Sequence, residues 1–428
     1  MTIGVEEIPF SELLSTVIDN RGRTCPTADR GIPLIATNCI RNELLYPTYD
    51  KVRFVSKETY NTWFRGHPLP GDILFVNKAT PGRVCLVPDP VDFCIAQDMV
   101  AVRANPKKVY PKYLFAILRS PIVQEKIGQM HVGTLIPHFK KGDFDKLPIP
   151  VPSQDEQRII GDIYFDLSAK IDLNRRMNET LEAIARALFK SWFVDFDPVR
   201  AKAEGRDPGL PPHLAALFPD RYEDSELGPI PAGWRVQSFA DTVEIIGGGT
   251  PKTAVAEYWN GEIPWFSVVD APTGSEVWVV DTEKKVTPQG VENSSTQVLP
   301  VGTTIISARG TVGRIALVGA PMAMNQSCYG LRGKVGTNGS FTYFATRELV
   351  TTLQQRAHGS VFDTITRDTL AGVLVATPSA ALVDAFERMV RAALGRIRAA
   401  VLESCTLAAL RDALLPKLIS GEIRVKAL

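Results

Sequence analysis

The amino-acid sequence is an imperfect duplicate of itself, with matching residues 226 positions apart. Near the end of each copy, Val151–Ser153 aligns with Thr377–Ser379. In the middle, TPGRVCLV from Thr80 matches TVGRIALV from Thr311 with a slip of five residues, as loops of unequal length would produce. Two copies of so long a unit do not make a solenoid, whose repeats are much shorter. The duplication therefore predicts two similar domains in one chain, related by a pseudo-twofold.

The first copy ends in a long amphipathic stretch. Ser153 and Glu156 have the spacing of a capping box, so a helix should begin near Gln154 and continue to Trp192. At a rise of 1.5 Å per residue, that helix would be roughly 58 Å long. Counting in sevens gives a coiled-coil seam of Ile160, Leu167, Asn174, Leu181 and Leu188, with Ile163, Ile171, Ile184 and Trp192 in the same stripe.

A second long helix is predicted from about Ala381 to Leu418 at the same heptad phase. A single helix lying on one domain is the alternative to paired helices, but Asn174 favours pairing, because one polar seam residue typically fixes the register with a partner helix. Pro416 is expected to break the second helix near its end. Its seam residues are Phe386, Ala393, Ala400, Leu407 and Leu414.

Short β-rich runs bounded by Gly and Pro precede helical periodicity in both copies, which predicts α+β domains. The expected fold is two globular domains separated by two long antiparallel coiled-coil helices. The segment between the copies is rich in Pro, Gly and charge, so it should be exposed with little core of its own. The expected boundaries are 1–152 for the first globule, 153–195 for the first helix, 196–230 for the connector, 231–379 for the second globule, and 380–428 for the second helix and tail.

The formal net charge of +1 excludes a globally basic protein, so nucleic-acid binding would have to come from local patches or from partners.

Six cysteines without CxxC or His spacing indicate reduced thiols and no metal site. The absence of an export signal or an apolar run of about 18 residues predicts a cytoplasmic protein. No Walker, HExxH, GxSxG or Asn-Pro-Pro-aromatic motif is present, so no catalytic residue is predicted. The glycine run at Gly247–Pro251 is interpreted as a flexible turn.

Basic residues on Gly- or Pro-flanked loops are the candidates for DNA contact, through phosphates or guanine edges, although for any single one of them an ordinary solvated charge is the favoured interpretation. Arg83 and Arg314 stand out because the repeat places both after the same Thr-x-Gly, although a turn that supports a strand would explain this equally well. Gly133-Thr134 and Gly359-Ser360 are predicted loop hinges that fix each globule on its helix, with a phosphate contact as the alternative. The candidates are Arg21, Arg23, Lys78, Arg83, Lys140 and Lys141 in the first copy, and Lys252, Arg309, Arg314 and Arg367 in the second.

LPIPVPSQDEQRII (147–160) and LNRRMNETLEAIARALFKSWFVDFDPV (173–199), taken with the repeat, resemble the DNA-specificity subunit of type I restriction–modification enzymes. The resemblance covers essentially the whole chain. It implies two target-recognition domains, each reading half of a split double-stranded DNA sequence, held apart by the long helices. It further implies two adenine-N6 methyltransferase subunits as partners, which carry S-adenosylmethionine, and restriction/translocase subunits that use ATP and Mg. The chain itself is then non-catalytic.

The resemblance also assigns the seam a role in helix pairing and partner docking, through Ile160, Leu167, Asn174, Leu181, Leu188, Trp192, Phe386, Leu407 and Leu414. The second copy departs from the pattern, because Val383-Asp384 stands where the first copy has Gln157-Arg158. Partner docking could therefore be unequal. Two other functions remain open: an interaction scaffold that has lost DNA reading, and an unrecognised nuclease or methyltransferase.

Overall fold

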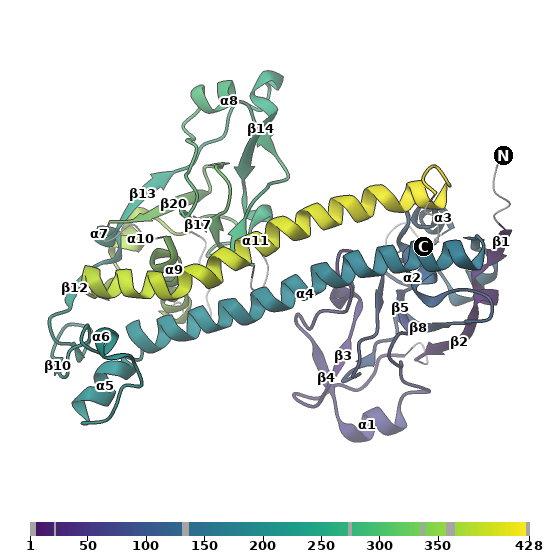
Figure 1. Ribbon diagram of the computed structural model, residues 1–428, viewed down its shortest axis with the longest axis horizontal. Coiled ribbons are helices and arrows are strands. Elements are labelled where there is room, and N and C mark those ends of the chain that lie inside the picture. The colour runs from purple at the N-terminus through teal and green to yellow at the C-terminus, as the bar shows by residue number, and fades with distance from the viewer. Residues whose placement is uncertain are drawn as a thin grey trace. The chain divides into compact units, whose positions relative to one another are not determined.

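The computed structural model describes residues 6–20, 23–130, 137–272, 276–334, 339–356 and 364–424. The chain divides into two compact units. Unit 1 contains Met1–Leu173 and Ser404–Leu428, and unit 2 contains Asn174–Glu403. Each of the two long helices therefore contributes one part to each unit (Figure 1).

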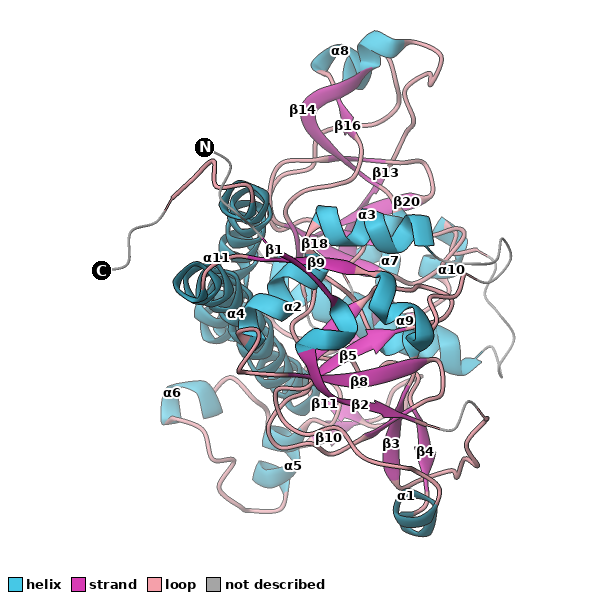
Figure 2. Ribbon diagram, turned by 90° about the vertical axis from the view of Figure 1, so that its right-hand side faces the viewer, coloured by secondary structure: helices cyan, strands magenta, loops and turns pink. Residues whose placement is uncertain are grey.

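Unit 1 is built on a four-stranded antiparallel sheet beside a smaller mixed sheet. In the smaller sheet one strand pairs with a neighbour on each side, antiparallel on one side and parallel on the other. The larger sheet has the order β2 (Leu14–Asp19), β8 (Met99–Ala104), β5 (Ile73–Val76) and β6 (Val84–Leu86), and Figure 2 shows β2, β8 and β5 side by side. The smaller sheet has the order β4 (Arg53–Val55), β3 (Ile32–Ile35) and β7 (Cys94–Ile95), and β1 (Glu6–Pro9) pairs with β9 (Pro148–Val151). The helices of this part are α1 (Lys57–Thr62), α2 (Pro111–Arg119) and α3 (Pro121–Met130), with 3₁₀ turns at η1 (Phe10–Leu13), η2 (Thr37–Cys39) and η3 (Lys141–Lys146).

Unit 2 repeats this topology with one added strand. Its small sheet again has a central strand with one antiparallel and one parallel neighbour. The large sheet has the order β13 (Val243–Gly247), β20 (Cys328–Gly333), β17 (Thr304–Ser307), β18 (Ile315–Val318) and β15 (Trp278–Val279). The small sheet has the order β16 (Lys285–Val286), β14 (Trp259–Phe266) and β19 (Ala323–Met324), and β12 (Arg235–Ser238) pairs with β21 (Leu374–Thr377). The helices are α7 (Phe239–Thr242), α8 (Pro288–Glu292), α9 (Gly339–Arg356) and α10 (Arg367–Ala371), with η4 (Ala256–Tyr258) and η5 (Val268–Asp270). The duplication and the α+β class predicted from the sequence are thus confirmed.

The first long helix, α4, runs from Gln154 to Phe193 and begins where its capping box predicts. The Ser153 backbone N–H donates to Glu156 Oε2 (3.1 Å), and the Glu156 N–H donates to Ser153 Oγ (3.4 Å). Gln157 is buried beside this cap. It accepts from the Tyr110 N–H (2.8 Å) and donates to the Pro152 carbonyl (2.8 Å), so it ties the start of α4 to the start of α2.

The second long helix, α11, runs from Ala380 to Ile419 and therefore matches its predicted extent. The prediction that Pro416 breaks it is wrong, because the helix continues through this residue. A proline removes one N–H and crowds the preceding turn, but only a few helical residues follow it here. At the other end, Val383 occupies the position of Gln157 and is fully buried, so apolar packing replaces the amide contacts of the first copy.

Within each unit the two long helices pack antiparallel. In unit 1, Ser168 of α4 meets Arg411 of α11 (3.5 Å), and Ile160 shares a core with Leu415 and Leu418. In unit 2, the Phe189 ring lies 5.6 Å from that of Phe386. Asn174 Nδ2 donates to the Ala400 carbonyl (3.5 Å) and to Glu403 Oε2 (2.9 Å). Asn174 and Ala400 are equivalent positions of the repeat, 226 residues apart, and they meet directly.

The buried face of α4 is more polar than the heptad pattern predicts. Leu167, Leu181 and Leu188 are half-buried, and Ile184 is 59% exposed, so the predicted place of Ile184 in the stripe is wrong. Polar side chains fill the interior instead: Gln157, Ser168, Asp172, Asn174, Asn178 and Glu182 are all buried. Each such group needs a partner inside the protein, so this face demands specific matching and not only apolar contact.

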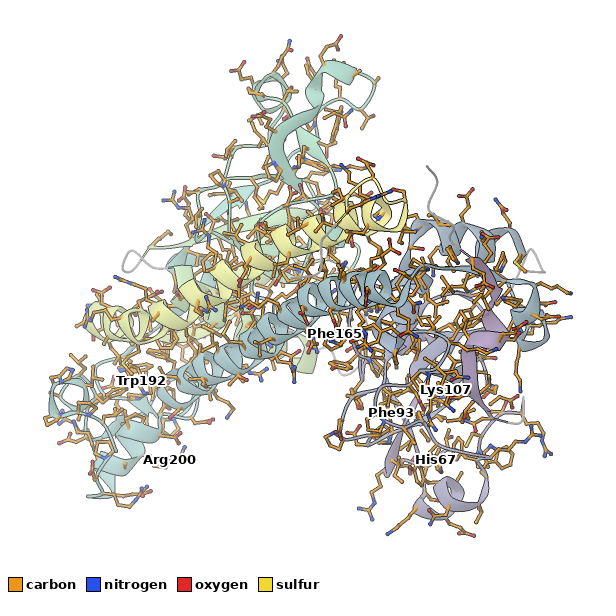
Figure 3. All side chains as sticks on the ribbon, turned by 45° about the vertical axis from the view of Figure 1, so that its right-hand side comes forward. His67, Phe93, Lys107, Phe165, Trp192 and Arg200 are labelled. Carbon is orange, nitrogen blue, oxygen red and sulfur yellow. The ribbon has the colours of Figure 1, made fainter. Side chains whose placement is uncertain are left out.

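The segment after α4 is predicted to be exposed with little core of its own; just over half of residues 196–230 are exposed, but the segment also contributes buried residues to the core of unit 2. It forms two short helices and a strand pair: α5 (Asp197–Ala203), α6 (Pro212–Ala215), β10 (Tyr222–Glu223) and β11 (Ile230–Pro231). Val199, Leu214 and Phe218 are buried in the core of unit 2. Trp192 lies near the C-terminal end of α4 (Figure 3). Phe218 meets it edge-on, with ring centroids 5.1 Å apart. The prolines and charges of this segment suggested a loop, but several of its apolar residues pack into the core of unit 2, although Leu227 is exposed.

Candidate nucleic-acid interface

Two loops that carry basic residues lie side by side in unit 1. The first follows β5, and the second precedes η3. The Phe139 N–H donates to the Asn77 carbonyl (2.9 Å), and Asn77 Nδ2 donates to the Phe139 carbonyl (2.9 Å). The Ala79 N–H donates to the Pro137 carbonyl (3.1 Å). The backbones of Lys78 and His138 form an isolated antiparallel β-bridge. Because Asn77 and Phe139 are buried, these bonds hold the two loops as one surface, named here the paired-loop surface (residues 77–83 and 137–141).

The paired-loop surface brings together three of the predicted DNA-contact residues, Lys78, Lys140 and Lys141, all exposed. Lys78 lies 3.6 Å from Asp98, and Lys141 lies 2.9 Å from Asp19. Exposed pairs of this kind contribute about 0–1 kcal/mol each. Within the described residues, Lys140 has no ion-pair partner. These cations are therefore available to an anionic ligand at little cost to the fold.

His138 lies among these lysines. Partial burial, and then the charges of Lys78 and Lys140, lower the pKa of its imidazole below the ordinary value, against the opposing effects of Asp98 and Asp143. A lowered pKa means that the protonated form is disfavoured in this positive field. The same group would gain a proton if a polyanion neutralised the lysines.

Unit 2 contains an equivalent paired-loop surface (residues 308–314 and 364–367). The Ile365 N–H donates to the Ala308 carbonyl (2.8 Å). The backbones of Arg309 and Thr364 form an isolated antiparallel β-bridge. Arg309 thus occupies the place of Lys78, and Arg367 corresponds to Lys141 in the repeat. Arg367 Nη2 donates to the Ile245 carbonyl (3.0 Å), whereas Arg309 has no side-chain ion pair or hydrogen bond within the part of the chain that the structure describes.

The remaining basic candidates lie in different surroundings. Arg23 sits over the Trp63 ring, 5.6 Å from its centroid, and Lys252 is exposed after the glycine run of unit 2. Arg83 and Arg314 lie in the two repeated turns. Arg21 falls outside the described residues, as do both predicted hinges, Gly133-Thr134 and Gly359-Ser360.

The glycine run before Lys252 is pinned, so its interpretation as a flexible turn is wrong. A Cβ at Gly248 would lie 1.9 Å from the Asn325 carbonyl oxygen, and one at Gly249 would lie 2.4 Å from the Thr296 N. Gly249 also donates its N–H to the Met324 carbonyl (3.0 Å), and its own carbonyl accepts from Trp265 Nε1 (3.0 Å). Glycine is required here because two backbones approach closely.

The predicted helix-pairing residues occupy a range of burial. Leu167, Leu181, Leu188, Leu407 and Leu414 are half-buried, whereas Ile160, Asn174, Trp192 and Phe386 are buried.

Sequence reasoning missed two buried arginines of unit 1. Arg119 donates to the carbonyls of Leu44 and Val84 and lies over the Phe115 ring, and Arg411 lies over the Tyr164 ring. Burial lowers the pKa of Arg119.

A cluster of three or more His, Cys, Asp or Glu side chains able to hold a metal ion is not found among the described residues. In the same part of the chain, no helix combines the length and apolarity needed to cross a bilayer. Each unit presents a paired-loop surface, on which basic side chains project from loops joined by backbone hydrogen bonds.

Residues 23–183 and 231–381 match the family model of the type I restriction modification DNA specificity domain, and the chain belongs to this family. It is 28% identical over 400 residues to the type I restriction enzyme HindI specificity subunit of Haemophilus influenzae, covering 82% of this chain and 86% of that one. It is also 29% identical over 160 residues to the MjaIX specificity subunit of Methanocaldococcus jannaschii, 37% of each chain.

The crystal structure of the type I restriction–modification S subunit from M. genitalium superposes with a TM-score of 0.54 at 16% identity, over 97% of this chain and 96% of that one. At this identity the similarity concerns the fold alone. Together with the family match, it confirms the prediction from the duplication and the motifs: the chain is a type I restriction–modification specificity subunit with two target-recognition domains.

Proposed function

We propose that this chain recognises a split double-stranded DNA sequence, with one half-site bound at the paired-loop surface of each unit. The observation that carries the proposal is the repetition of that surface. In both units two loops are joined by backbone hydrogen bonds, and both present cations at equivalent positions. Lysine and arginine on held loops suit phosphate contacts and base-edge readout, whereas the overall charge of +1 gives no general attraction to DNA.

The chain is proposed to be non-catalytic and to direct partner subunits. Two methyltransferase subunits that carry S-adenosylmethionine would methylate adenine N6, and restriction/translocase subunits would use ATP and Mg for cleavage. This part of the proposal rests on family membership and on the absence of catalytic motifs from the sequence. Phosphate contacts made by the methyltransferase subunits would add to those of a nearly neutral specificity subunit.

Exchange of residues 8–146 for the equivalent part of a relative tests the proposal. Mapping of methylated adenines in host DNA, with and without the exchanged chain, should show one half-site changed and the other kept. The expected outcome follows from each unit having its own paired-loop surface. A change of both half-sites at once, or no sequence-dependent methylation in the presence of the unmodified chain, would contradict independent DNA reading.

DNA affinity should depend on pH through His138. Phosphates near Lys78 and Lys140 would favour the imidazolium and raise its pKa in the complex above the lowered value of the free protein. Binding then takes up a proton, so affinity should rise several-fold as pH falls from about 7.5 to about 5.5. His138→Gln should flatten this dependence in fluorescence-anisotropy titrations at constant ionic strength, and an unchanged pH profile in the variant would remove His138 from the interface.

A further inference from the structure

A turn with the same geometry precedes β6 in unit 1 and β18 in unit 2. Gly82 has a φ of +89° and Gly313 a φ of +82°. Gly82 donates its N–H to the Val76 carbonyl (3.0 Å), and Gly313 donates to that of Ser307 (2.9 Å). A Cβ would lie 3.0 Å from Ile127 Cγ2 in the first turn and 2.9 Å from Val350 Cγ1 in the second. The positive φ and the close approach to a helix explain both glycines structurally.

The arginines that follow these glycines have no such structural reason. Arg83 is exposed and Arg314 is half-buried. Neither side chain has a hydrogen bond or ion pair within the described residues. Of the neighbouring positions, Thr80, Leu86 and Val87 are identical to Thr311, Leu317 and Val318, whereas Pro81 and Cys85 differ from Val312 and Ala316. Support of the strand therefore accounts for the turn, but it leaves the repeated guanidinium without a role in the fold.

In unit 1, side chains hold the backbone on both sides of Arg83. Gln124 Nε2 donates to the Gly82 carbonyl (2.8 Å), and Arg119 Nη2 donates to the Val84 carbonyl (2.7 Å). The Val84 N–H donates to Asn42 Oδ1 (2.9 Å). Gln124 is itself fixed, because it also donates to the Leu118 carbonyl (2.5 Å) at the end of α2.

In unit 2, one hydroxyl group performs the same task. Ser307 is fully buried, and its Oγ accepts from the Arg314 N–H (2.8 Å) and donates to the Thr311 carbonyl (2.6 Å). The two units thus use different residues, an amide in one and a hydroxyl in the other, to fix the backbone of the same arginine. Because two different sets of hydrogen bonds hold the backbone of this arginine in the same geometry, we take that geometry to be needed for function.

We infer that Arg83 and Arg314 are specificity-determining residues that read base edges in the two half-sites, and that Gln124 and Ser307 are positioning residues for them. The inference rests on the proposed DNA recognition. A guanidinium on a fixed backbone loses less conformational freedom on binding and offers a planar fork suited to the O6 and N7 atoms of guanine. Exposed lysines such as Lys78 and Lys140, as flexible point charges, suit phosphates.

A double-mutant cycle tests the inference in the complex of the full chain with its methyltransferase partner. The variants are Arg83→Ala, Gln124→Met and the double variant, because methionine keeps the size of Gln124 and removes its donor. The probe is a duplex that carries the split sequence found by methylation mapping, together with duplexes changed at one base pair at a time. Dissociation constants are measured for each combination.

Arg83→Ala should weaken binding to the intact sequence by about 5-fold to 150-fold and abolish discrimination at one base pair of one half-site. Gln124→Met should reduce discrimination several-fold at that same base pair, and the double variant should match Arg83→Ala alone. In unit 2, Ser307→Ala should act in this way through Arg314 at the other half-site, and Ser307→Thr, which keeps the hydroxyl, should restore binding. Retained discrimination at the other base pairs of the same half-site shows that the substituted unit is folded.

Three results would overturn the inference. Gln124→Met could lower affinity equally with and without Arg83, which would give it a purely structural role. Arg83→Ala could weaken all duplexes equally, which would make Arg83 a phosphate contact. If instead the unmodified complex shows no preference for any split sequence, the proposed function itself fails together with the inference.

Discussion

The triple variant Lys78→Ala, Lys140→Ala and Lys141→Ala is expected to bind the split DNA sequence about 10²-fold to 10³-fold more weakly near 0.15 M salt. Each lysine that contacts a phosphate contributes on the order of 1–1.5 kcal/mol through charge-assisted contact and release of counterions. The slope of log K against log salt should fall in magnitude by about three, close to 0.9 per contact removed. Anisotropy titrations at several salt concentrations measure both quantities.

The loss should not come from unfolding, because the ion pairs of Lys78 and Lys141 are exposed. A matched variant, Lys57→Ala, Lys107→Ala and Lys108→Ala, removes the same charge from exposed positions elsewhere in unit 1; Lys107 is labelled in Figure 3. It should change the salt slope by less than one. Equal losses in both triple variants would mean that net charge, and not the paired-loop surface, governs binding.

The second large effect concerns an ion pair in unit 2 whose carboxylate is buried. Arg347 of α9 lies 2.6 Å from Glu182 of α4, and the Glu182 side chain is only 4% exposed. Removing one partner leaves a buried charge uncompensated, which typically costs 3–5 kcal/mol. Arg186 lies 4.0 Å from the same carboxylate and can compensate part of the charge. Arg347→Met should therefore destabilise unit 2 by about 2–4 kcal/mol.

Hydrogen-exchange mass spectrometry of the full chain measures this effect locally, with unit 1 amides as an internal reference. The double variant Glu182→Leu and Arg347→Met should recover most of the loss, because replacing both charges by apolar side chains removes the desolvation penalty. Arg186→Met alone should change protection little. If Arg347→Met leaves the exchange of α4 and α9 amides unchanged, the ion pair does not stabilise their contact.

The sequence predicted the elements whose signals are local. The Ser153–Glu156 box placed the start of α4, and Gly- and Pro-bounded runs located β5, β6, β17 and β18. The repeat aligned Arg83 with Arg314, and the five-residue slip correctly paired their turns. A single sequence is enough to detect these signals, because capping, turn geometry and strand length depend on neighbouring residues.

What the sequence did not predict depends on contacts between distant residues. Counting apolar residues in heptads could not reveal that Ser168, Asn178 and Glu182 would be buried, because the buried face of α4 is defined by partners on α9 and α11. The inward-facing Phe218 and the pinned Gly249 were missed for the same reason. Hydrogen bonds between segments far apart in the chain, such as that from Phe139 to Asn77, decide which basic residues lie on one surface. The sequence does not reveal these bonds.

The contact between Asn174 and Ala400 constrains how the protein can evolve. Because corresponding positions of the two copies face each other there, a bulky side chain in one copy requires a small one in the other. α4 and α11 each contain 40 residues, and they contact each other within both units, as at Ser168 and Arg411 and at Phe189 and Phe386. A lengthening of one helix alone would put every later pair out of step, so descendants of this duplication should gain or lose turns in both helices together.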